Sequence, residues 1–540
     1  MSPQSPPVRN ALLSVSDKSG LLPFAQGLVT AGVTLYASGG TRQHLEKAGL
    51  EVREVSSYTN FPEMLDGRLK TLHPKIHGGI LCRHDHPDDI KSLSEHGIVT
   101  FELVVVNLYP FEQTIARPGV TYAEAIEKID IGGPTLVRGA AKNHAFTTIA
   151  TDSEQYEEIL AQIRDSGATT PGLRQRLATK AFVLTAAYDT AISSYLQAIL
   201  ASESFPVDSS WEVEPSGEQT LPTQLQFSLP RIATLRYGEN PHQSSALYAD
   251  PSAPAVNLVS AKQLNGKELS YNNYLDLDAA LSIVRLLDDP AVSVVKHNNP
   301  CGAAVAQTLA EATQKATEGD PLSAFGSVLG FNRPVDAESA EILVEPGKFI
   351  EAIVAPGFES GALEVLTTKP KWKANVRLME LGSLPPVKSS LQLRHIEGGF
   401  LVQQIDNQPD PHELWEVVTD AKGDDNLLHE LQFAWEIVRH VKSNAIALCR
   451  DRMLIGTGAG QMSRVDSVQI AIQKAGDRAS GSVLASDAFF PFPDSIDVAA
   501  AAGIAAIIQP GGSRRDNEVI AACNRHGLPM IFTGRRHFKH

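Results

Sequence analysis

The sequence predicts an α/β protein in which strands and helices alternate along most of the chain. In the first 150 residues, short apolar runs typical of buried strands are separated by helix-like segments; the runs are ALLSV (11–15), VTLYA (33–37), LVVVNLYP (103–110) and FTTIAT (146–151). Strands that alternate with helices favour a parallel sheet covered on both faces. Later runs of the same kind are AVSVVKH (291–297), SVLGF (327–331), IEAIVAP (350–356), AIALC (445–449), SVLAS (482–486) and AAIIQ (505–509).

Two α/β regions are joined by a segment of different composition. Residues 1–203 form the first domain, which ends in a stretch of helical periodicity over 171–200. Residues 204–229 are rich in Ser, Pro, Glu and Gly and predict a linker, although Trp211 within it could dock on a neighbouring surface. Residues 230–540 form the second region, and its length of about 310 residues predicts two subdomains. No internal repeat is evident.

Composition and charge exclude several classes of function. The chain has 540 residues and a formal net charge of −15, with 43% hydrophobic and 20% charged residues. This balance is ordinary for a soluble globular protein and argues against a general nucleic-acid-binding surface. The four cysteines show no CxxC spacing, which favours free thiols in a reducing cytosol. With no signal-like N-terminus and no apolar stretch long enough to span a membrane, we expect a cytoplasmic protein that binds neither nucleic acid nor membrane.

Small polar loops in the first domain suggest anion sites. SVSDKSG (14–20) and SGGT (38–41) each follow a strand and precede a helix, where small residues and a helix N-terminus can hold an anion. Ordinary turn and capping chemistry explains either loop equally well. DGRLKTLHPKIHGG (66–79) adds a basic cluster that favours a phosphorylated small molecule. A metal role for His73 and His77 is disfavoured because Pro74 interrupts a helix there and no HExxH pattern is present.

A further candidate segment is EKIDIGGPTLVRGAAKNHA (127–145). A helix that begins near Pro134 places Arg138 and Lys142 four residues apart on one face. Two cations so placed could bind phosphate, or one could act as an acid–base group. A solvated helical face is the alternative.

The segment VVKHNNPCG (294–302) allows three interpretations. A zinc-deaminase site needs PCxxC, but Ala303 and Ala304 follow the glycine and the second cysteine is missing. Cys301 as a nucleophile needs a nearby base, and its place after Pro300 is more typical of a helix start or a small hydrophobe. Lys296 and His297 could instead move protons together. Adjacent strand residues point to opposite faces, so the pair can share a site only where the strand ends, and the turn-forming NNP predicts such a break.

Nine strings along the chain together resemble one known family. They are SVSDKSG, ASGGT, FPEMLDGRLKTLHPKIHGGI, NLYPF, IDIGGPTLVRGAAKNH, LRYGENPHQ, KHNNPCG, GAGQMSR and SDAFFPF. In this order they resemble the PurH family of bifunctional purine biosynthesis proteins. The resemblance implies a methylglyoxal-synthase-like IMP cyclohydrolase domain, followed by an AICAR transformylase region of two cytidine-deaminase-like subdomains. It also implies a homodimer that needs no metal.

The transformylase would transfer the formyl group of 10-formyltetrahydrofolate to the 5-amine of AICAR. The resemblance makes His297 the base and Lys296 the group that stabilises the transition state. Further positions match nucleotide or folate contacts of the family: Arg236, Tyr237, Gly326, Glu351, Asn444, Arg464, Val465, Phe489 or Phe490, and Arg536. Glu351 stands where some members carry Asp, so its contact is less closely defined.

The cyclohydrolase would then close FAICAR to IMP with loss of water. The resemblance makes Lys142 the acid–base residue, supported by Lys70, Tyr109 and Asp130. The matching nucleotide-binding positions are Ser16, Asp17, Lys18, Ser38, Gly39, Gly40, Thr41, Arg68, Thr71, Asn107 and Ile131. The alternatives are a single-activity transformylase and a nucleotide-binding regulatory protein without catalysis.

Overall fold

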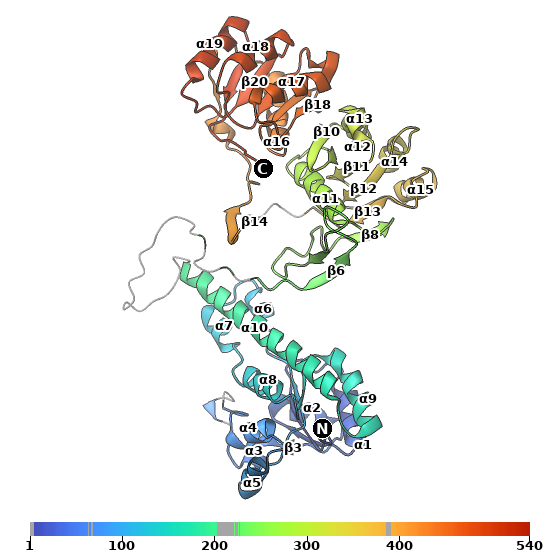
Figure 1. The fold of residues 1–540 in the computed structure, drawn as a ribbon, viewed down its shortest axis with the longest axis vertical. Coiled ribbons are helices and arrows are strands. Elements are labelled where there is room, and N and C mark those ends of the chain that lie inside the picture. Colours follow the sequence, from blue (N-terminus) through green and yellow to red (C-terminus); the bar gives the residue numbers. More distant parts are fainter. Residues whose placement is uncertain are drawn as a thin grey trace, which may run out of the picture. The chain divides into compact units, whose positions relative to one another are not determined.

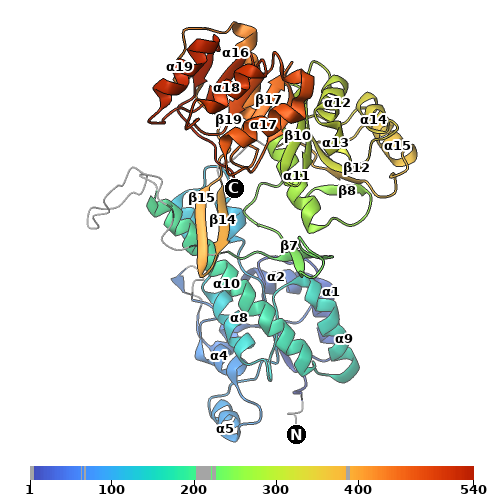
Figure 2. The same cartoon turned by 45° about the horizontal axis from the view of Figure 1, so that its top comes forward.

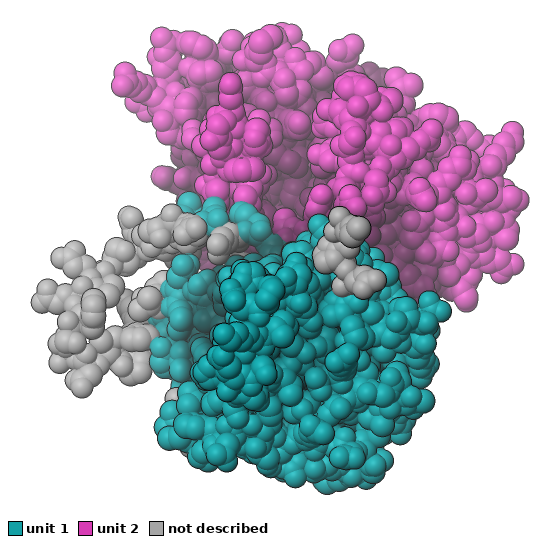
Figure 3. All heavy atoms as spheres, turned by 60° about the horizontal axis from the view of Figure 1, so that its bottom comes forward, with its two compact units in different colours: residues 1–228 teal, residues 229–540 magenta. Residues whose placement is uncertain are grey.

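The computed structural model describes residues 5–62, 64–65, 69–201, 221, 225, 227–384 and 390–540. The chain forms two compact units, residues 1–228 and 229–540, which Figure 3 colours separately. The predicted linker over 204–229, including Trp211, lies almost entirely outside the described residues.

Unit 1 is built on a five-stranded sheet in the order β3-β2-β1-β4-β5. Every strand pair in it is parallel, as the alternation of strands and helices predicted. The strands are β1 (Asn10–Ser14), β2 (Thr34–Ala37), β3 (Arg53–Glu54), β4 (Leu103–Val106) and β5 (Thr148–Ala150). All four residues of β4 are buried, because helices cover both faces of the sheet.

The helices of unit 1 surround this sheet (Figure 1). They are α1 (Leu21–Thr30), α2 (Gly39–Lys47), α3 (Val55–Thr59), α4 (Pro74–Leu81), α5 (Pro87–Glu95), α6 (Phe111–Ile115), α7 (Tyr122–Glu127), α8 (Gly132–Lys142), α9 (Tyr156–Ser166) and α10 (Pro171–Ala201). Helix α1 packs on α9, and α8 packs on α4 and α10. The helix predicted over 171–200 is therefore confirmed as α10.

The order of the strands in unit 1 indicates where a ligand would bind. From β1 the chain proceeds outward through β2 and β3, then returns to add β4 on the other side of β1. Helices that cross over in opposite directions leave a gap at the carboxyl ends of the two strands where the direction changes, and ligands of open α/β sheets bind there. The loops that follow β1 and β4 are SVSDKSG and NLYPF, two of the strings that carry the family resemblance.

Unit 2 contains a twelve-stranded sheet made of two six-stranded halves. The first half has the order β8-β13-β12-β11-β9-β10 and the second has the order β16-β21-β20-β19-β17-β18. The halves join where β10 runs antiparallel to β18. Each half has the same succession of parallel and antiparallel pairs, so the structure contains an internal repeat that the sequence did not reveal.

The twelve strands fall into matching sets. Those of the first half are β8 (Lys262–Asn265), β9 (Ala291–Lys296), β10 (Asn299–Val305), β11 (Ser327–Phe331), β12 (Ile350–Ala355) and β13 (Arg377–Glu380). Those of the second half are β16 (Glu416–Val417), β17 (Ile446–Arg450), β18 (Met453–Gly458), β19 (Val483–Ser486), β20 (Ala506–Gln509) and β21 (Met530–Phe532).

Helices cover both faces of the large sheet. One continuous core lies under α11 (Tyr271–Val284) and α16 (Asp425–Val438). The opposite face carries one core in each half; its helices are α12 (Leu309–Glu318), α13 (Pro321–Ala324), α14 (Ala337–Leu343), α15 (Ser360–Thr368), α17 (Arg464–Ala475), α18 (Asp494–Ala501) and α19 (Asp516–His526). The strands therefore form the middle layer of three.

Two small antiparallel ribbons complete unit 2. They pair β6 (Arg231–Leu235) with β7 (Ser245–Tyr248), and β14 (Leu391–Ile396) with β15 (Gly399–Gln404). Figure 2 shows β14 and β15 as a ribbon outside the twelve-stranded sheet. Among the described residues, none of the helices has the length and apolarity that a membrane span requires.

Candidate active sites

In unit 1 the loops after β1 and β4 are joined directly. The side-chain oxygen of Asn107 accepts hydrogen bonds from the backbone N–H groups of Ser16 (2.6 Å) and Asp17 (3.1 Å), and its amide donates to the carbonyl oxygen of Asp17 (2.8 Å). Thr41 Oγ1 bonds the N–H and the carbonyl oxygen of Val15, both at 3.1 Å. Three predicted binding segments thus meet at the carboxyl edge of the sheet.

Lys70 and Thr71 lie beside the same segments. A Cβ atom on Gly39, where φ is +50°, would collide with the ammonium group of Lys70. A Cβ atom on Gly132 would stand 3.2 Å from Thr71 Oγ1, at the start of α8. The glycines therefore allow both side chains to approach the loop after β2 and the N-terminus of α8. Arg68, predicted for the same site, lies outside the described residues.

Asp130 is held at the start of α8. Its Oδ1 accepts the N–H of Gly133 at 2.8 Å, and its own N–H donates to the hydroxyl of Tyr188 at 2.8 Å. Burial raises the pKa of the Asp130 carboxyl, and the N–H groups of Gly133 and Tyr109 offset part of that rise. Burial, with the charge of Asp130, also raises the pKa of Tyr109. Tyr109 and Ile131 expose apolar surface beside this carboxyl, as a ligand-binding surface would.

Lys142 is exposed and ends α8, so its backbone lies roughly 15 Å along the helix axis from Gly132, where the helix begins. Helix α8 begins two residues before Pro134, and Arg138 on its exposed face packs over the ring of Phe182 at 5.7 Å.

The segment around His73 corrects one expectation. Pro74 does not interrupt a helix; it is the first residue of α4, where its missing N–H costs nothing. His73 is the N-cap, and its Nδ1 accepts the N–H of Lys75 at 3.1 Å. No group of three or more His, Cys, Asp or Glu side chains that could hold a metal ion occurs within the described parts of the chain.

In unit 2 the Lys–His segment is a tight hairpin. Lys296 is the last residue of β9 and pairs with Asn299, the first of β10, so the two-residue loop is His297–Asn298. The turn therefore precedes Asn299 and Pro300, which belong to a strand and not to the predicted NNP turn. Lys296 Nζ donates to the carbonyl oxygen of Phe325 at 2.6 Å, next to Gly326. His297 leaves the strand on the side of α11.

Cys301 lies in β10 and does not begin a helix. A register shift between Pro300 and Gly302 allows the proline and the cysteine to stand in the strand, because the hydrogen-bond ladder is interrupted there. Cys301 packs beside the apolar core, as a small hydrophobe does. Burial raises the pKa of its thiol to about 12, which opposes a nucleophilic role.

A buried ion pair holds the predicted Arg464. Its Nη1 is 2.5 Å from Asp487 Oδ1 and 2.8 Å from Ser486 Oγ, and its Nη2 donates to Asn444 Oδ1 at 2.8 Å. Asp487 is fully buried and also accepts the N–H of Ala445 at 3.1 Å. The strings KSNA, GQMSR and SDAFF, separate in the sequence, thus meet at the start of β17 and the end of β19.

The other predicted residues of unit 2 are held in different ways. Gly326 has φ +72°, and Glu351 pairs with Arg377 at 2.5 Å. The guanidinium groups of Arg236 and Arg536 pack over the rings of Tyr237 and Phe538, at 5.5 and 4.5 Å. Val465, the second residue of α17, is partly exposed. Phe490 is fully buried in the core, whereas Phe489 is 36% exposed, so only Phe489 is open to a ligand.

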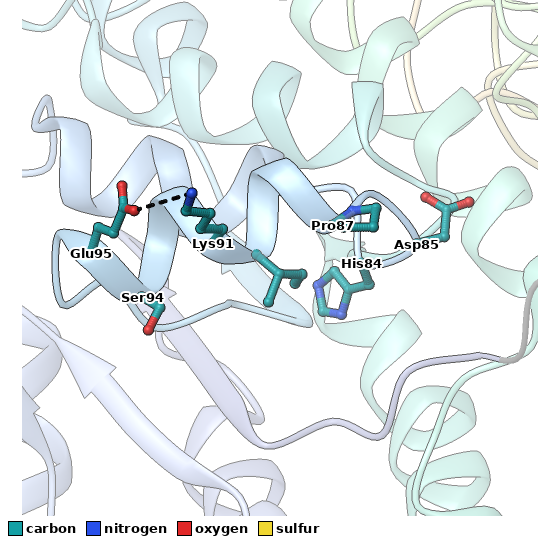
Figure 4. A pocket seen from close by; sticks show the side chains of 7 residues that line it. His84, Asp85, Pro87, Lys91, Ser94 and Glu95 are labelled. Carbon is teal, nitrogen blue, oxygen red and sulfur yellow. Dashed lines mark ion pairs between the residues drawn. The ribbon is translucent and has the colours of Figure 1, made fainter.

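Two cavities lie away from these residues. In unit 1, a pocket of about 490 Å³ lies against α5 and the loop before it, and Figure 4 shows the charged pair Lys91–Glu95 at its edge. In unit 2, a cavity of about 850 Å³ is lined by the end of α11, by residues 407–412 and by α16. Neither lining includes a predicted site residue.

Several residues near the sites carry no motif that sequence reasoning could use. Tyr188 and Asp276 come from helices and reach Asp130 and Asn298 across 58 and 22 residues. Asn299 Oδ1 accepts the N–H of Lys442 at 3.0 Å and joins the hairpin to the loop before Asn444. Asp487 and Asn299, by contrast, lie within SDAFFPF and KHNNPCG, two of the strings that carry the family resemblance.

Comparison with known proteins gives concordant matches along the chain. The profile of the AICARFT/IMPCHase bienzyme family matches residues 140–474, and that of the MGS-like domain matches residues 20–135. The bifunctional purine biosynthesis protein PurH of Rhodopirellula baltica is 59% identical over 534 residues, 99% of each chain. The protein of the same name from Desulfitobacterium hafniense is 49% identical over 533 residues, 98% of this chain and 100% of that one. The crystal structure of ForH shares 35% identity over 34% of this chain and 97% of its own, with a TM-score of 0.32.

Two α/β units carry separate clusters of polar side chains at strand ends, as expected of an enzyme with two sites. The matches make that enzyme a bienzyme of purine biosynthesis. The chain belongs to the PurH family, whose two activities are AICAR transformylase and IMP cyclohydrolase.

Proposed function

We propose that residues 230–540 transfer the formyl group of 10-formyltetrahydrofolate to the 5-amine of AICAR, and that residues 1–203 cyclise the product, FAICAR, to IMP. Residues 204–229 act as the linker between the two domains. The observation that carries the proposal is the contact of Lys296 Nζ with the carbonyl oxygen of Phe325 at 2.6 Å, because it sets the ammonium group beside Gly326, a predicted nucleotide contact.

His297 is the proposed base of formyl transfer. The lone pair of the 5-amine is delocalised into the ring and the carboxamide, so the amine attacks only if its proton is removed, and a histidine can accept a proton near neutral pH. Lys296 stabilises the negative charge that develops on the formyl oxygen, or donates a proton to the departing folate nitrogen. Folate supplies the formyl carbon as a cosubstrate, and no metal takes part.

The remaining residues of unit 2 bind and orient the two substrates. Arg464 is rigid because Asp487 and Asn444 fix its guanidinium, which suits recognition of an anionic or carbonyl group. Phe489 offers an exposed ring for the flat pterin, and Val465 borders the same ligand. The proposed nucleotide contacts are Arg236, Tyr237, Gly326, Glu351, Asn444 and Arg536.

Cyclisation requires a proton to leave the carboxamide nitrogen and water to depart. Asp130, Tyr109 and Lys70 supply groups of different proton affinity near the N-terminus of α8, and the raised pKa of Asp130 suits proton exchange. Lys142 is the proposed acid–base residue by resemblance, and Lys70 is proposed to support it. The nucleotide is proposed to lie along the loops of Ser16–Lys18, Ser38–Thr41, Arg68, Thr71, Asn107 and Ile131.

The chain is proposed to act in the cytoplasm as a homodimer with small-molecule ligands, namely AICAR, FAICAR, IMP and folate. Support for catalysis without a membrane or nucleic-acid partner comes from its charge of −15 and from its family. The dimer is proposed from the family resemblance alone. Sedimentation equilibrium checks it, and a single monomeric species at catalytic concentration would contradict it.

Incubation of the purified chain with AICAR and 10-formyltetrahydrofolate tests the two activities together. IMP formation is expected; accumulation of FAICAR would leave one activity, and no turnover would leave binding alone. His297→Ala should abolish formyl transfer while FAICAR supplied directly is still cyclised. Lys142→Ala should stop IMP formation without stopping folate turnover, and Lys70→Ala in parallel decides which lysine exchanges the proton.

A further inference from the structure

The hairpin that carries His297 adopts a backbone that its own sequence disfavours. The φ angles of His297 and Asn298 are +53° and +62°, and two positive values in a two-residue loop define a type I′ turn. This turn favours Asn-Gly or Gly-Gly because glycine adopts positive φ without strain. Here neither central residue is glycine, so neighbouring contacts must hold the conformation.

Asp276, in the second turn of α11, makes those contacts. Its Oδ1 accepts the backbone N–H of Asn298 at 2.7 Å. With its amide nitrogen toward α11, the side chain of Asn298 donates to the same oxygen at 3.2 Å and to the carbonyl oxygen of Leu275 at 3.1 Å. The backbone of His297 also faces this carboxylate, and it offsets part of the rise in the pKa of Asp276 that burial causes. One side chain therefore contacts both turn residues.

The helix that carries Asp276 is itself fixed. A capping box between Ser270 and Asn273 begins α11, and Leu277 and Leu281 are buried in the core beneath it. Ser293 Oγ donates to the carbonyl oxygen of Ala280 at 2.8 Å and ties the middle of β9 to the same helix. Because α11 is fixed in this way, the carboxylate of Asp276 has a defined position relative to the end of β9.

The second half of unit 2 repeats this arrangement. The hairpin of β17 and β18 turns through Asp451 and Arg452, whose φ angles are +55° and +53°. The N–H of Arg452 donates to both carboxylate oxygens of Glu430, at 2.9 and 3.0 Å. Glu430 is the sixth residue of α16 and Asp276 is the sixth residue of α11. A helix carboxylate therefore binds the second residue of a type I′ turn in both halves.

Only one of the two hairpins has the side chains for proton transfer. Lys296 and His297 occupy the last strand position and the first turn position of the first hairpin, where the second hairpin has Arg450 and Asp451. Both hairpins have a glycine, Gly302 or Gly456, at which a Cβ atom would collide with a helix carbonyl oxygen. The carboxylate contact is thus part of the repeated fold, and the Lys–His pair is specific to one copy.

We propose that Asp276 is a positioning residue for formyl transfer: its carboxylate holds the His297–Asn298 turn by accepting the backbone and side-chain N–H groups of Asn298, and so sets the place of the His297 imidazole. This inference rests on the proposed role of His297 as the base. Asp276 does not exchange a proton with the substrate. Misplacement of a catalytic group by about 1 Å can lower a rate by about 100-fold, so the effect of losing this contact is measurable.

Two single variants of Asp276 and a matched control at the second hairpin test the proposal. Asp276→Leu removes the acceptor and is expected to lower kcat for formyl transfer about 30-fold, with little change in the Kd for AICAR. Asp276→Asn keeps an oxygen acceptor and is expected to retain activity within about threefold, with an unchanged pH profile of kcat/KM. Glu430→Leu, the matched change at the second hairpin, should leave kcat within about twofold because no catalytic side chain stands there.

A glycine introduced into the turn distinguishes loss of the positioning contact from loss of the folded structure. Asn298→Gly lets the turn adopt positive φ without help, so Asp276→Leu with Asn298→Gly should regain most of the lost kcat. A collapsed helix α11 would not be repaired by that glycine. If Asp276→Asn is as inactive as Asp276→Leu, and glycine restores nothing, the carboxylate acts through its charge and the proposal is wrong.

The role of His297 is tested separately. If His297→Ala retains formyl transfer, the proposed function of His297 fails and the Asp276 variants are expected to be silent. If His297→Ala is inactive while Asp276→Leu is fully active, only the positioning role fails.

Discussion

The hydroxyl of Tyr188 accepts a hydrogen bond from the backbone N–H of Asp130 at 2.8 Å and donates one to the carbonyl oxygen of Lys128 at 3.3 Å. One phenol on α10 thus closes the turn that precedes α8. Tyr188→Phe keeps the ring but leaves that N–H unpaired, at a cost of roughly 1–3 kcal/mol. We expect cyclisation of FAICAR to slow about 10-fold while formyl transfer is unchanged.

A second tyrosine of α10 provides the control for this variant. Tyr195 packs edge-on against Phe111, with ring centroids 5.7 Å apart. Tyr195→Phe should leave both activities at their original rates, measured with FAICAR and with AICAR as substrate. Equal losses in the two variants would mean that the hydrogen bonds of the Tyr188 hydroxyl have no specific role in cyclisation.

The ion pair of Arg464 and Asp487 leads to a prediction about stability. Both side chains are buried, so Asp487→Asn leaves an uncompensated guanidinium, and breaking a buried pair costs roughly 3–5 kcal/mol. We expect a lower midpoint of urea unfolding and a raised KM for AICAR. Asp466→Asn, at an exposed position of α17, is the matched change and should alter neither. An unchanged midpoint for Asp487→Asn would show that Arg464 is held by other groups.

His537 stands between two carboxylates and makes stability depend on pH. Its Nδ1 is 2.5 Å from Asp406 and its Nε2 is 2.7 Å from Asp410. Burial opposes the charged ring, but the two hydrogen bonds outweigh it and raise the pKa of His537. Burial likewise opposes ionisation of Asp410, yet bonds from His537 and Trp435 lower its pKa to about 2.

The directions of these two pKa shifts determine the pH ranges over which the folded state loses stability. A raised pKa in the folded state means that the contribution of His537 is complete below about pH 6.5 and disappears as pH rises through the folded value. The contribution of Asp410 is present above about pH 3.9 and disappears as pH falls through about 2. Thermal melts from about pH 6 to about pH 9 should show a decline in Tm that His537→Gln flattens. A parallel decline in both proteins would exclude His537 as its source.

The sequence predicted the fold because it shows the pattern that the fold requires. Strands buried on both faces must be continuous apolar runs, and all ten runs identified overlap β1, β2, β4, β5, β9, β11, β12, β17, β19 and β20. Strand β10 was not predicted, since Pro300 reads as a turn and the bulge that accommodates it is set by the partner strand. The repeat in unit 2 was not evident because it requires matching shapes and few identical residues.

The sequence predicted those site residues that belong to short, recognisable sequence motifs. Loops such as SVSDKSG and NLYPF have side chains that meet once the strand order is known, and their composition is visible in the sequence. Tyr188 and Asp276 act from helices with no local signal, so only the folded chain reveals them. Whether Phe489 or Phe490 can contact a ligand depends on which of the two rings is buried in the core. Packing in the folded chain decides this, and the local sequence does not show it.

The four cysteines should be unreactive in the native chain. All are free, and burial raises the pKa of Cys82 to about 11, those of Cys301 and Cys523 to about 12, and that of Cys449 as well. The thiolate is the reactive form, so labelling by a disulfide reagent at about pH 8 should be slow until guanidinium exposes all four. Rapid native labelling of Cys301, located by mass spectrometry, would reopen the nucleophile interpretation.

Lys474 and Asp320 join the two halves of unit 2 near Lys296. Lys474, on α17, pairs with Asp320 Oδ2 at 2.8 Å, and Asp320 Oδ1 caps α13 by accepting the N–H of Ser323 at 3.1 Å. Helix α13 leads to Phe325, whose carbonyl oxygen binds Lys296. The Lys474 side chain is 40% exposed, so the pair contributes little to stability, roughly below 1 kcal/mol.

We therefore expect Lys474→Met to leave the unfolding midpoint unchanged but to lower kcat for formyl transfer severalfold, because α13 loses its anchor to the second half. Asp320→Asn keeps the oxygen that accepts the N–H of Ser323 at the start of α13, but it removes the charge that binds Lys474 and the oxygen that accepts the Ser323 hydroxyl at 2.6 Å. If the ion pair is the link, the double variant should be no slower than either single variant, since the second change removes a contact that is already lost. Additive losses would mean that the two side chains act independently and not through their ion pair.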